Sequence, residues 1–374
     1  MRKQVKYTIY NMFKSNRKTI CILIFIVLSS LSSFSQKKTD NLYIEANGKY
    51  GFLMGHHTFF SYFYEKHPYA YDIKISKQLT GEKNWHSLYR YPRLGGGYGF
   101  CNIGSEYFGS AHSIFGFINI PISKSKINSF NYTISFGYAY VTEHFDTDDN
   151  HYNLAIGSAG NVYFNLALDY KLRIAKNLQI KTGLSLTHFS NGAYAKPNTG
   201  INVVTADAGL LYNFDVTEYK KAKKEEHKAF NEYSVIASGG VRETSTHTPQ
   251  KFVITTLSIN AERMFWRKRK MGLGIDLFYD TSLKYRLEAD TSIQYSNIVN
   301  LRPGIHYSHD IVFGKTSITM QVGYYLYTEF KVDGNIYSRF GLRHKLSKHF
   351  IASVSLKTHY FKADFIEWGI GYAL

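Results

Sequence analysis

Residues 130–140 read FNYTISFGYAY, with an aromatic or aliphatic side chain at almost every second position. Successive side chains of a strand point to opposite faces, so this stretch has one apolar face and one face of small and polar residues. Residues 316–326 (TSITMQVGYYL) and 366–374 (IEWGIGYAL) repeat the pattern. Strands of soluble sheets are usually about 5–6 residues long. Alternation sustained over about ten residues predicts the transmembrane strands of a β-barrel instead.

The composition agrees with that prediction. Aromatic residues make up 17% of the chain, with 32 Tyr and 27 Phe, which suits the aromatic girdles of a barrel at two membrane interfaces. The mean hydropathy of −0.27 excludes a helical membrane protein. It is compatible with a barrel, because polar residues alternate with apolar ones along each strand.

The N-terminus has the pattern of a secretory signal. Residues 1–18 carry six Lys and Arg and no acid, and an apolar run follows from Ile20 to Leu31. Ser33 and Ser35 supply small residues at the two positions that a signal peptidase reads. The alternative is an anchoring helix, but the run is shorter than the roughly 20 residues that a membrane span needs. We expect residues 1–35 to be a cleaved signal peptide.

The charge of the chain indicates its surroundings. The formal net charge is +17, which in another context would point to nucleic acid. Export argues against that partner and favours anionic lipid headgroups. We therefore expect an integral protein of the outer membrane of a Gram-negative bacterium, with no nucleic-acid partner. No zinc, Rossmann or phosphate-loop motif is present in the sequence, and we expect neither a metal nor a cofactor.

The predicted fold is all-β, a transmembrane antiparallel up-and-down barrel of about 12–16 strands spanning residues 36–374. A connection at 214–231 separates residues 42–214 from additional strands at 232–374. We expect the sheet to close once as a large barrel, the alternative being two small barrels in tandem. The candidate strands are 42–54, 67–78, 93–103, 111–121, 129–140, 160–173, 176–189, 201–213, 232–242, 251–265, 270–280, 296–308, 314–328, 335–346, 349–359 and 363–374.

One stretch carries candidate chemistry: LTHFSNG at 186–192, followed by PNTGIN at 197–202. His188 and Ser190 are two residues apart on one strand and so share a face. Their parity is that of Ile180 and other apolar residues, which places them on the lipid side of the barrel. A His and a Ser there are costly without a purpose, and together they can form a base and a nucleophile. The alternative is that both are simply rim residues.

This stretch resembles the outer-membrane lipid A 3-O-deacylase (PagL) family, through His188-Phe189-Ser190-Asn191 and the Pro197-Asn198 pair. The resemblance covers about residues 42–214. The end of the chain, with LKTH at 356–359 and ADFIEWG at 363–369, is similar to a longer acyloxyacyl hydrolase-like group.

The resemblance implies a serine esterase that removes an ester-linked acyl chain from lipid A, with lipopolysaccharide as its substrate. Ser190 would be the nucleophile and His188 the general base, and Asn191 with the backbone near Gly192 would hold the oxyanion. The third catalytic position of the family is an acid, and here it maps to Asn202, whose parity places it on the lipid side beside His188.

The departure at Asn202 leaves alternatives open. An Asn can orient an imidazole but does not stabilise its cation as a carboxylate does. The acid could instead come from Glu143 or the cluster at 146–149, whereas Asp207 has the wrong parity. The chain could also be a non-enzymatic barrel, a pore or surface-interaction protein with a degenerate site. A phospholipase on the same barrel is a third reading.

Overall fold

The computed structural model describes residues 41–55, 63, 65–214, 219, 228–246, 249–290, 293–360 and 362–374. The predicted signal peptide, residues 1–35, lies outside the described residues. Within them, no helix has the length and apolar character that a membrane span requires.

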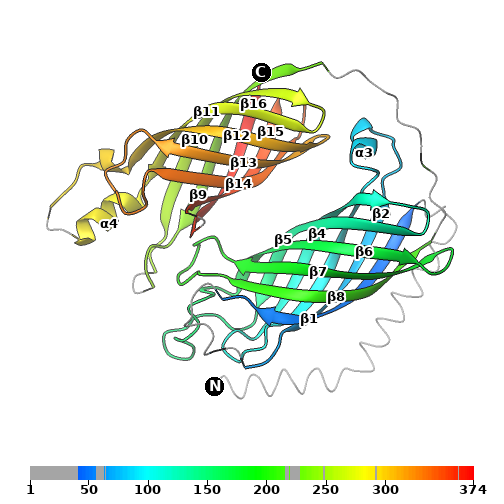
Figure 1. Ribbon diagram of the computed structural model, residues 1–374. Helices are drawn as coiled ribbons and strands as arrows, with labels where there is room; N and C mark the ends of the chain where they lie inside the picture. The colour runs from blue at the N-terminus through cyan, green and yellow to red at the C-terminus, as the bar shows by residue number, and fades with distance from the viewer. Residues whose placement is uncertain are drawn as a thin grey trace.

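The first half of the chain is an antiparallel barrel in which each strand pairs with the next and β8 pairs back onto β1 (Figure 1). A one-turn helix, α3 (Asn84–Leu88), lies in the β2–β3 connection. The eight strands are β1 (Leu42–Leu53), β2 (Tyr69–Gln78), β3 (Arg93–Asn102), β4 (Ser110–Lys124), β5 (Asn128–Val141), β6 (Gly160–Arg173), β7 (Leu178–Ser190) and β8 (Ile201–Asn213).

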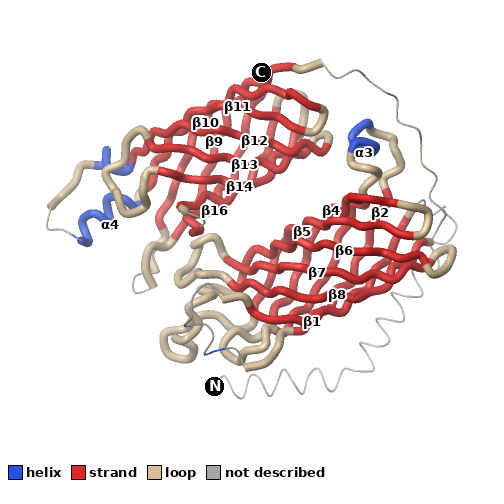
Figure 2. The backbone as a smooth tube through the Cα atoms, in the orientation of Figure 1, coloured by secondary structure: helices blue, strands red, loops and turns tan. Residues whose placement is uncertain are grey.

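The second half closes in the same way, with β16 pairing onto β9 (Figure 2). Helices α4 (Ser282–Asp290) and η2 (Asn297–Asn300) lie in its β11–β12 connection. The strands are β9 (Phe230–Arg242), β10 (Phe252–Trp266), β11 (Arg269–Asp280), β12 (Leu301–Phe313), β13 (Thr316–Tyr325), β14 (Ile336–Lys345), β15 (Phe350–His359) and β16 (Lys362–Ala373).

The sixteen strands match the predicted ones, but the expected single closure is wrong. The sheet closes twice, into barrel 1 (β1–β8) and barrel 2 (β9–β16). The physical reason is that closure depends on which distant strands pair, and β1 pairs with β8 along nearly its whole length. Alternation along each strand is the same in one large barrel or two small ones, so it could not distinguish them.

The predicted alternation of faces is confirmed on both barrels. On β7, Leu184 is 63% exposed on the outer wall, whereas the neighbouring Ser185 is 4% exposed and faces the lumen. On β16, Trp368 is 67% exposed and Glu367 only 4%. A wall that is apolar outside and polar inside reverses the arrangement of a soluble protein and is typical of membrane-spanning barrels.

Paired charges fill the two lumens. In barrel 1, Glu45 contacts Lys181 at 2.7 Å and Arg93 at 3.2 Å. In barrel 2, Asp276 contacts Arg339 at 3.0 Å and His306 at 2.7 Å. An eight-stranded barrel leaves room only for side chains, and buried charges must be paired. The lumens therefore have the character of packed cores rather than open channels.

The two barrels touch at the end that carries their short turns. The Tyr89 hydroxyl, just after α3, donates to the Val312 carbonyl at 3.0 Å, and the Tyr89 ring lies 4.4 Å from that of Phe313 between centroids. Lys268, in the β10–β11 turn, lies over the Tyr89 ring at 4.9 Å. The β2–β3 connection at 79–92 is thus long because it holds a helix that contacts barrel 2.

Candidate active site

His188 and Ser190 lie at the C-terminal end of β7, on the outer wall of barrel 1. They continue the row of Ile180 and Leu184, which are 40% and 63% exposed. The parity prediction for both residues is therefore confirmed. The next strand, β8, pairs in register so that Asn202 lies directly opposite His188, also on the outer wall.

A hydrogen-bonded chain joins these three side chains. His188 Nε2 lies 2.9 Å from Ser190 Oγ, and His188 Nδ1 lies 2.6 Å from Asn202 Oδ1. An amide oxygen only accepts hydrogen bonds, so His188 donates through Nδ1. In a neutral imidazole the other nitrogen, Nε2, is then free to accept from the serine hydroxyl. The arrangement can move a proton from Ser190 to His188.

Neighbouring strands set the surroundings of this chain. Ser190 and Asn202 are only 6% and 7% exposed, and His188 is half-buried. On β6, Val162 lies opposite Ser190 and Phe164 opposite His188. The serine therefore lies beside an apolar strip of the outer wall, next to which an aliphatic chain could lie.

The β7–β8 loop after the serine is held by Asn191. Its backbone N–H donates to Asn198 Oδ1 at 2.9 Å, and its side-chain Nδ2 donates to Ser158 Oγ at 3.1 Å and to the Ala195 carbonyl at 3.0 Å. Both amide hydrogens of the Asn191 side chain are thus engaged within the protein. Sequence reasoning noted Asn198 only as a motif residue and missed Ser158, which lies in a distant loop.

Two glycines allow the close approach of backbone to the site. Gly192 and Gly200 have φ values of +62° and +80°, a region that favours glycine. A Cβ on Gly200 would lie 2.6 Å from the His188 ring, and one on Gly192 would collide with Ile366 of barrel 2. The loop is therefore packed against the imidazole on one side and against the second barrel on the other.

Barrel 2 makes specific polar contacts with the same loop. The Glu243 backbone N–H donates to the Ala193 carbonyl at 2.9 Å, and the Lys196 N–H donates to Glu243 Oε2 at 2.7 Å. Lys251 pairs with Glu243 at 2.6 Å and also donates to the Tyr194 carbonyl. Nothing in the sequence indicated these contacts, because Glu243 and Lys251 lie about fifty residues further along the chain.

Electrostatics distinguish one side chain of this loop. Burial, together with the positive charges of Lys362, Arg242 and Arg286, lowers the pKa of Lys196 to about 8, against the opposing effect of Glu243. Three of these cations belong to barrel 2. The loop thus lies near three cations of barrel 2, of which Arg242 and Arg286 are paired with acids of the same barrel.

The acidic alternatives to Asn202 are located as follows. Asp207 faces the lumen, as its parity predicts, and contacts Lys49 at 3.6 Å and Thr205 at 2.6 Å. Asp146 accepts from the backbone N–H groups of Asp148 and Asp149 at 3.0 and 3.1 Å, which is a local turn. The position against His188 Nδ1 is filled by Asn202.

The second motif of the resemblance lies inside barrel 2. Lys357 pairs with Asp364 at 2.7 Å, and His359 accepts from or donates to the Tyr325 hydroxyl at 2.9 Å. The register of β15 and β16 shifts by one residue beside Lys357, so that Asp364 and Phe365 are both buried. These residues form a luminal cluster rather than an outer-wall site.

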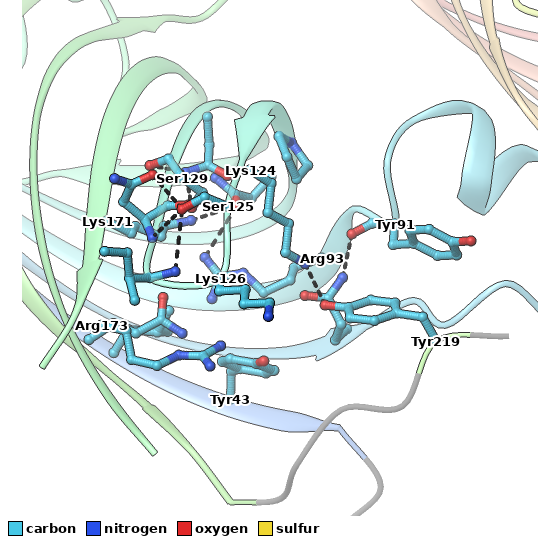
Figure 3. Close-up of a pocket in the computed structure, with 18 residues that line it drawn as sticks. Tyr43, Tyr91, Arg93, Lys124, Ser125, Lys126, Ser129, Lys171, Arg173 and Tyr219 are labelled. Atoms are coloured by element: carbon cyan, nitrogen blue, oxygen red, sulfur yellow. Dashed lines mark hydrogen bonds between the residues drawn. The ribbon is translucent and has the colours of Figure 1, made fainter. Parts of the chain in front are cut away.

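A separate pocket opens at the other end of barrel 1, around Arg93, Lys124, Lys171 and Arg173 (Figure 3). Ser190, His188 and Asn202 are not among its lining residues. In the part of the chain that the structure describes, no group of three or more His, Cys, Asp or Glu side chains could hold a metal ion.

Comparison with known families gives two matches. Residues 69–210 match the family described as lipid A 3-O-deacylase (PagL), and residues 231–374 match the acyloxyacyl hydrolase C-terminal domain. The two matches divide the chain as the two barrels do, and they confirm the resemblance seen in the sequence. No curated protein matches the chain.

Solved structures resemble the chain only distantly. Neisserial surface protein A is 11% identical over 47% of this chain and 98% of its own, with a TM-score of 0.32. A Rhodopseudomonas blastica porin variant is 10% identical over 89% of this chain and all of its own, with a TM-score of 0.19. CdiB from Acinetobacter baumannii is 8% identical over 90% of this chain and 60% of its own, with a TM-score of 0.18. Scores this low add nothing to the fold already described.

Proposed function

Because this chain belongs to the lipid A 3-O-deacylase (PagL) family, we propose that it is an outer-membrane serine esterase that removes an ester-linked acyl chain from lipid A. The observation that carries the proposal is the hydrogen-bonded chain of Ser190, His188 and Asn202 on the outer wall of barrel 1. An outer wall faces the acyl region of the membrane, where an ester of lipid A would meet the serine.

In the proposed reaction, Ser190 Oγ attacks the ester carbonyl while its proton passes to His188 Nε2. The tetrahedral intermediate then loses the sugar oxygen, which takes the proton back from His188. Water attacks the acyl-serine in the second half, with His188 again accepting a proton. Release of the fatty acid restores the Ser190 hydroxyl.

Two further residues support these steps. Asn202 holds the imidazole through Nδ1 in the tautomer that leaves Nε2 ready to accept. The oxyanion hole is assigned to Asn191 and Gly192, with the backbone N–H of Gly192 as the donor and Asn191 as the residue that shapes the loop. Because an amide does not stabilise the imidazolium as a carboxylate does, we expect a slower enzyme than one with an acid at that position.

The test is mass spectrometry of lipid A from Gram-negative cells that express the wild type, Ser190→Ala or Thr182→Ala. Thr182 lies exposed on the same outer row of β7 and serves as a matched control. We expect one acyl mass to be lost with the wild type and with Thr182→Ala, and retained with Ser190→Ala. Unchanged lipid A in all three, with each protein folded in the outer membrane, would contradict the proposal. Fatty acid released from phospholipid instead would identify a phospholipase.

A further inference from the structure

The pocket at the end of barrel 1 opposite the serine has an unusual charge. Five cations line it, namely Arg93, Lys124, Lys126, Lys171 and Arg173, and the described lining contains no Asp or Glu. Its remaining lining is largely hydroxyl and amide side chains. Figure 3 shows these side chains converging from separate strands and turns. Such a lining attracts an anion and repels a cation.

Arg93, one of the two buried cations of the pocket, is incompletely paired. Arg93 is 4% exposed, and its Nη2 contacts Glu45 at 3.2 Å and Asn119 Oδ1 at 3.3 Å. Its Nη1 is buried and has no hydrogen-bond partner among the described residues. Lys171 Nζ donates to the same amide oxygen, Asn119 Oδ1, at 2.6 Å and pairs with Asp169 at 3.0 Å. A buried donor without a partner is costly, and an anion in the pocket would supply one.

The size of the pocket limits what it can hold. Its cavity volume is about 60 Å³, several times the space that one water needs. That space suits a small oxyanion. A guanidinium beside lysine ammonium groups is the donor set that phosphate oxygens favour.

We propose that this pocket binds a phosphate group at the mouth of barrel 1, at the end away from the serine. The phosphate could be free or carried by a lipid headgroup, and both sources offer the same oxyanion to Arg93. The exposed cations Lys126 and Arg173 draw it in, and Arg93 with Lys171 holds it inside.

The experiment is calorimetric titration of the purified full-length mature protein in a phosphate-free neutral detergent. One arm uses inorganic phosphate and the other uses dihexanoyl phosphatidylglycerol. The test variant is Lys126→Ala/Arg173→Ala, which removes two exposed cations of the pocket. The matched control is Lys66→Ala/Lys176→Ala, which removes the same charge from exposed positions outside the pocket.

We expect the wild type and the control to bind alike and the test variant to bind at least ~10-fold more weakly. Binding of inorganic phosphate alone identifies a free anion, and tighter binding of the lipid identifies a headgroup. Absence of binding in both arms, or an equal loss in the control, would overturn the proposal.

A different set of contacts carries a second inference, which rests on the proposed function. Glu243 of barrel 2 is 6% exposed and holds the loop after Ser190 directly, through its backbone N–H and its Oε2. Its Oε1 pairs with Lys251, which donates to the Tyr194 carbonyl of the same loop. This loop contains Gly192, the assigned oxyanion donor. On the barrel 1 side, Asn191 holds the same loop through hydrogen bonds to Asn198 and Ser158. We infer that Glu243 is a positioning residue, and that barrel 2 fixes the oxyanion loop of barrel 1.

Two kinds of measurement test this inference. The first is the deacylation rate of Glu243→Ala and Glu243→Gln in detergent micelles, where Gln retains an acceptor for the Lys196 N–H. The second is the amide hydrogen exchange of residues 193–196, which reports on the loop without any catalysis. Glu232→Gln is the control, because Glu232 pairs with Lys270 at 2.8 Å in the lumen at the other end of β9.

We expect Glu243→Ala to lower kcat at least ~10-fold with KM nearly unchanged, and to speed exchange of the loop amides. Glu243→Gln should recover part of kcat, and Glu232→Gln should leave both readouts unchanged. Faster exchange with an unchanged kcat would overturn the positioning role while leaving the esterase intact. An inactive wild type whose loop still exchanges faster in Glu243→Ala would contradict the esterase and not the contact.

Discussion

Strands β7 and β15 are the seventh strands of two barrels with the same architecture, and each carries a histidine near its end. On β7, His188 follows the parity of the apolar residues and lies on the outer wall beside Ser190. On β15, His359 follows the parity of Lys357 and lies in the lumen. The face on which the histidine lies, set by its position in the alternation along the strand, therefore separates a candidate catalytic base from a member of a packed polar core.

The following strands differ in the same way. Strand β8 presents Asn202 outward against His188, whereas β16 presents Asp364 inward against Lys357. At the position beside the base where the family's pattern has a carboxylate, the outer wall of barrel 1 thus has Asn202. Barrel 2 has the carboxylate of Asp364 near the corresponding strand end, but this side chain faces the lumen and not the outer wall. The two histidines are the same residue type and differ in the face of the barrel wall on which they lie, and this difference makes His188 rather than His359 the candidate base.

The largest effect should come from the two histidines. We expect His188→Ala to lower the deacylation rate by at least ~10³-fold, because the serine loses its base. His359→Ala should leave the rate within ~2-fold, since its ring contacts the luminal groups Tyr325 and Lys357. The measurement is the initial rate on purified lipid A in micelles. Equal losses in the two variants would remove the distinction between the barrels.

A smaller loss is expected from matched glycines. Gly200→Ala would place a Cβ 2.6 Å from the His188 ring at a φ of +80°, so we expect kcat to fall ~10²-fold as the imidazole is displaced. Gly334→Ala is the control in barrel 2, with a φ of +74° and a Cβ 2.8 Å from the Tyr360 hydroxyl. It should strain its own loop without changing kcat. A comparable loss of rate in the control would show that the effect is only structural.

A gain of rate is expected from Asn202→Asp. The carboxylate would accept from His188 Nδ1 as the amide does now and would also stabilise the imidazolium, so kcat should rise about 3- to 10-fold. Asn198→Asp, which changes a loop amide that contacts Asn191 instead, should show no such gain. A slower Asn202→Asp enzyme would indicate that Asn202 does more than stand in for an acid.

The smallest expected effect is a change with pH in the free energy of unfolding, caused by Lys196 at the contact between the barrels. The folded-state pKa of Lys196, about 8, lies below its unfolded value of roughly 10.4, so the unfolded chain binds more protons between these pH values. The free energy of unfolding should therefore rise as pH rises through that window. Urea midpoints at pH 7 and 10 should show this increase in the wild type, and a smaller one in Lys196→Met. An increase of the same size in both would assign it to other groups.

The sequence predicted everything that depends on local parity. Sixteen strands, the polar lumens and the outward placement of His188, Ser190 and Asn202 all follow from which residues alternate along a strand. Family resemblance at residues 188–191 added the reaction class, because a short motif of fixed spacing on one strand is also local information.

Tertiary structure alone decided where the sheet closes and what surrounds the site. Whether β8 pairs with β1 or continues into β9 depends on contacts between residues 150 to 170 positions apart, and alternation is the same in either case. The contacts of Ser158 and Glu243 with the loop after the serine also join residues far apart in sequence, 33 and 47 positions from their partners. Parity fixes the face on which a side chain lies, but long-range pairing fixes its neighbours, and the neighbours hold the loop after the serine.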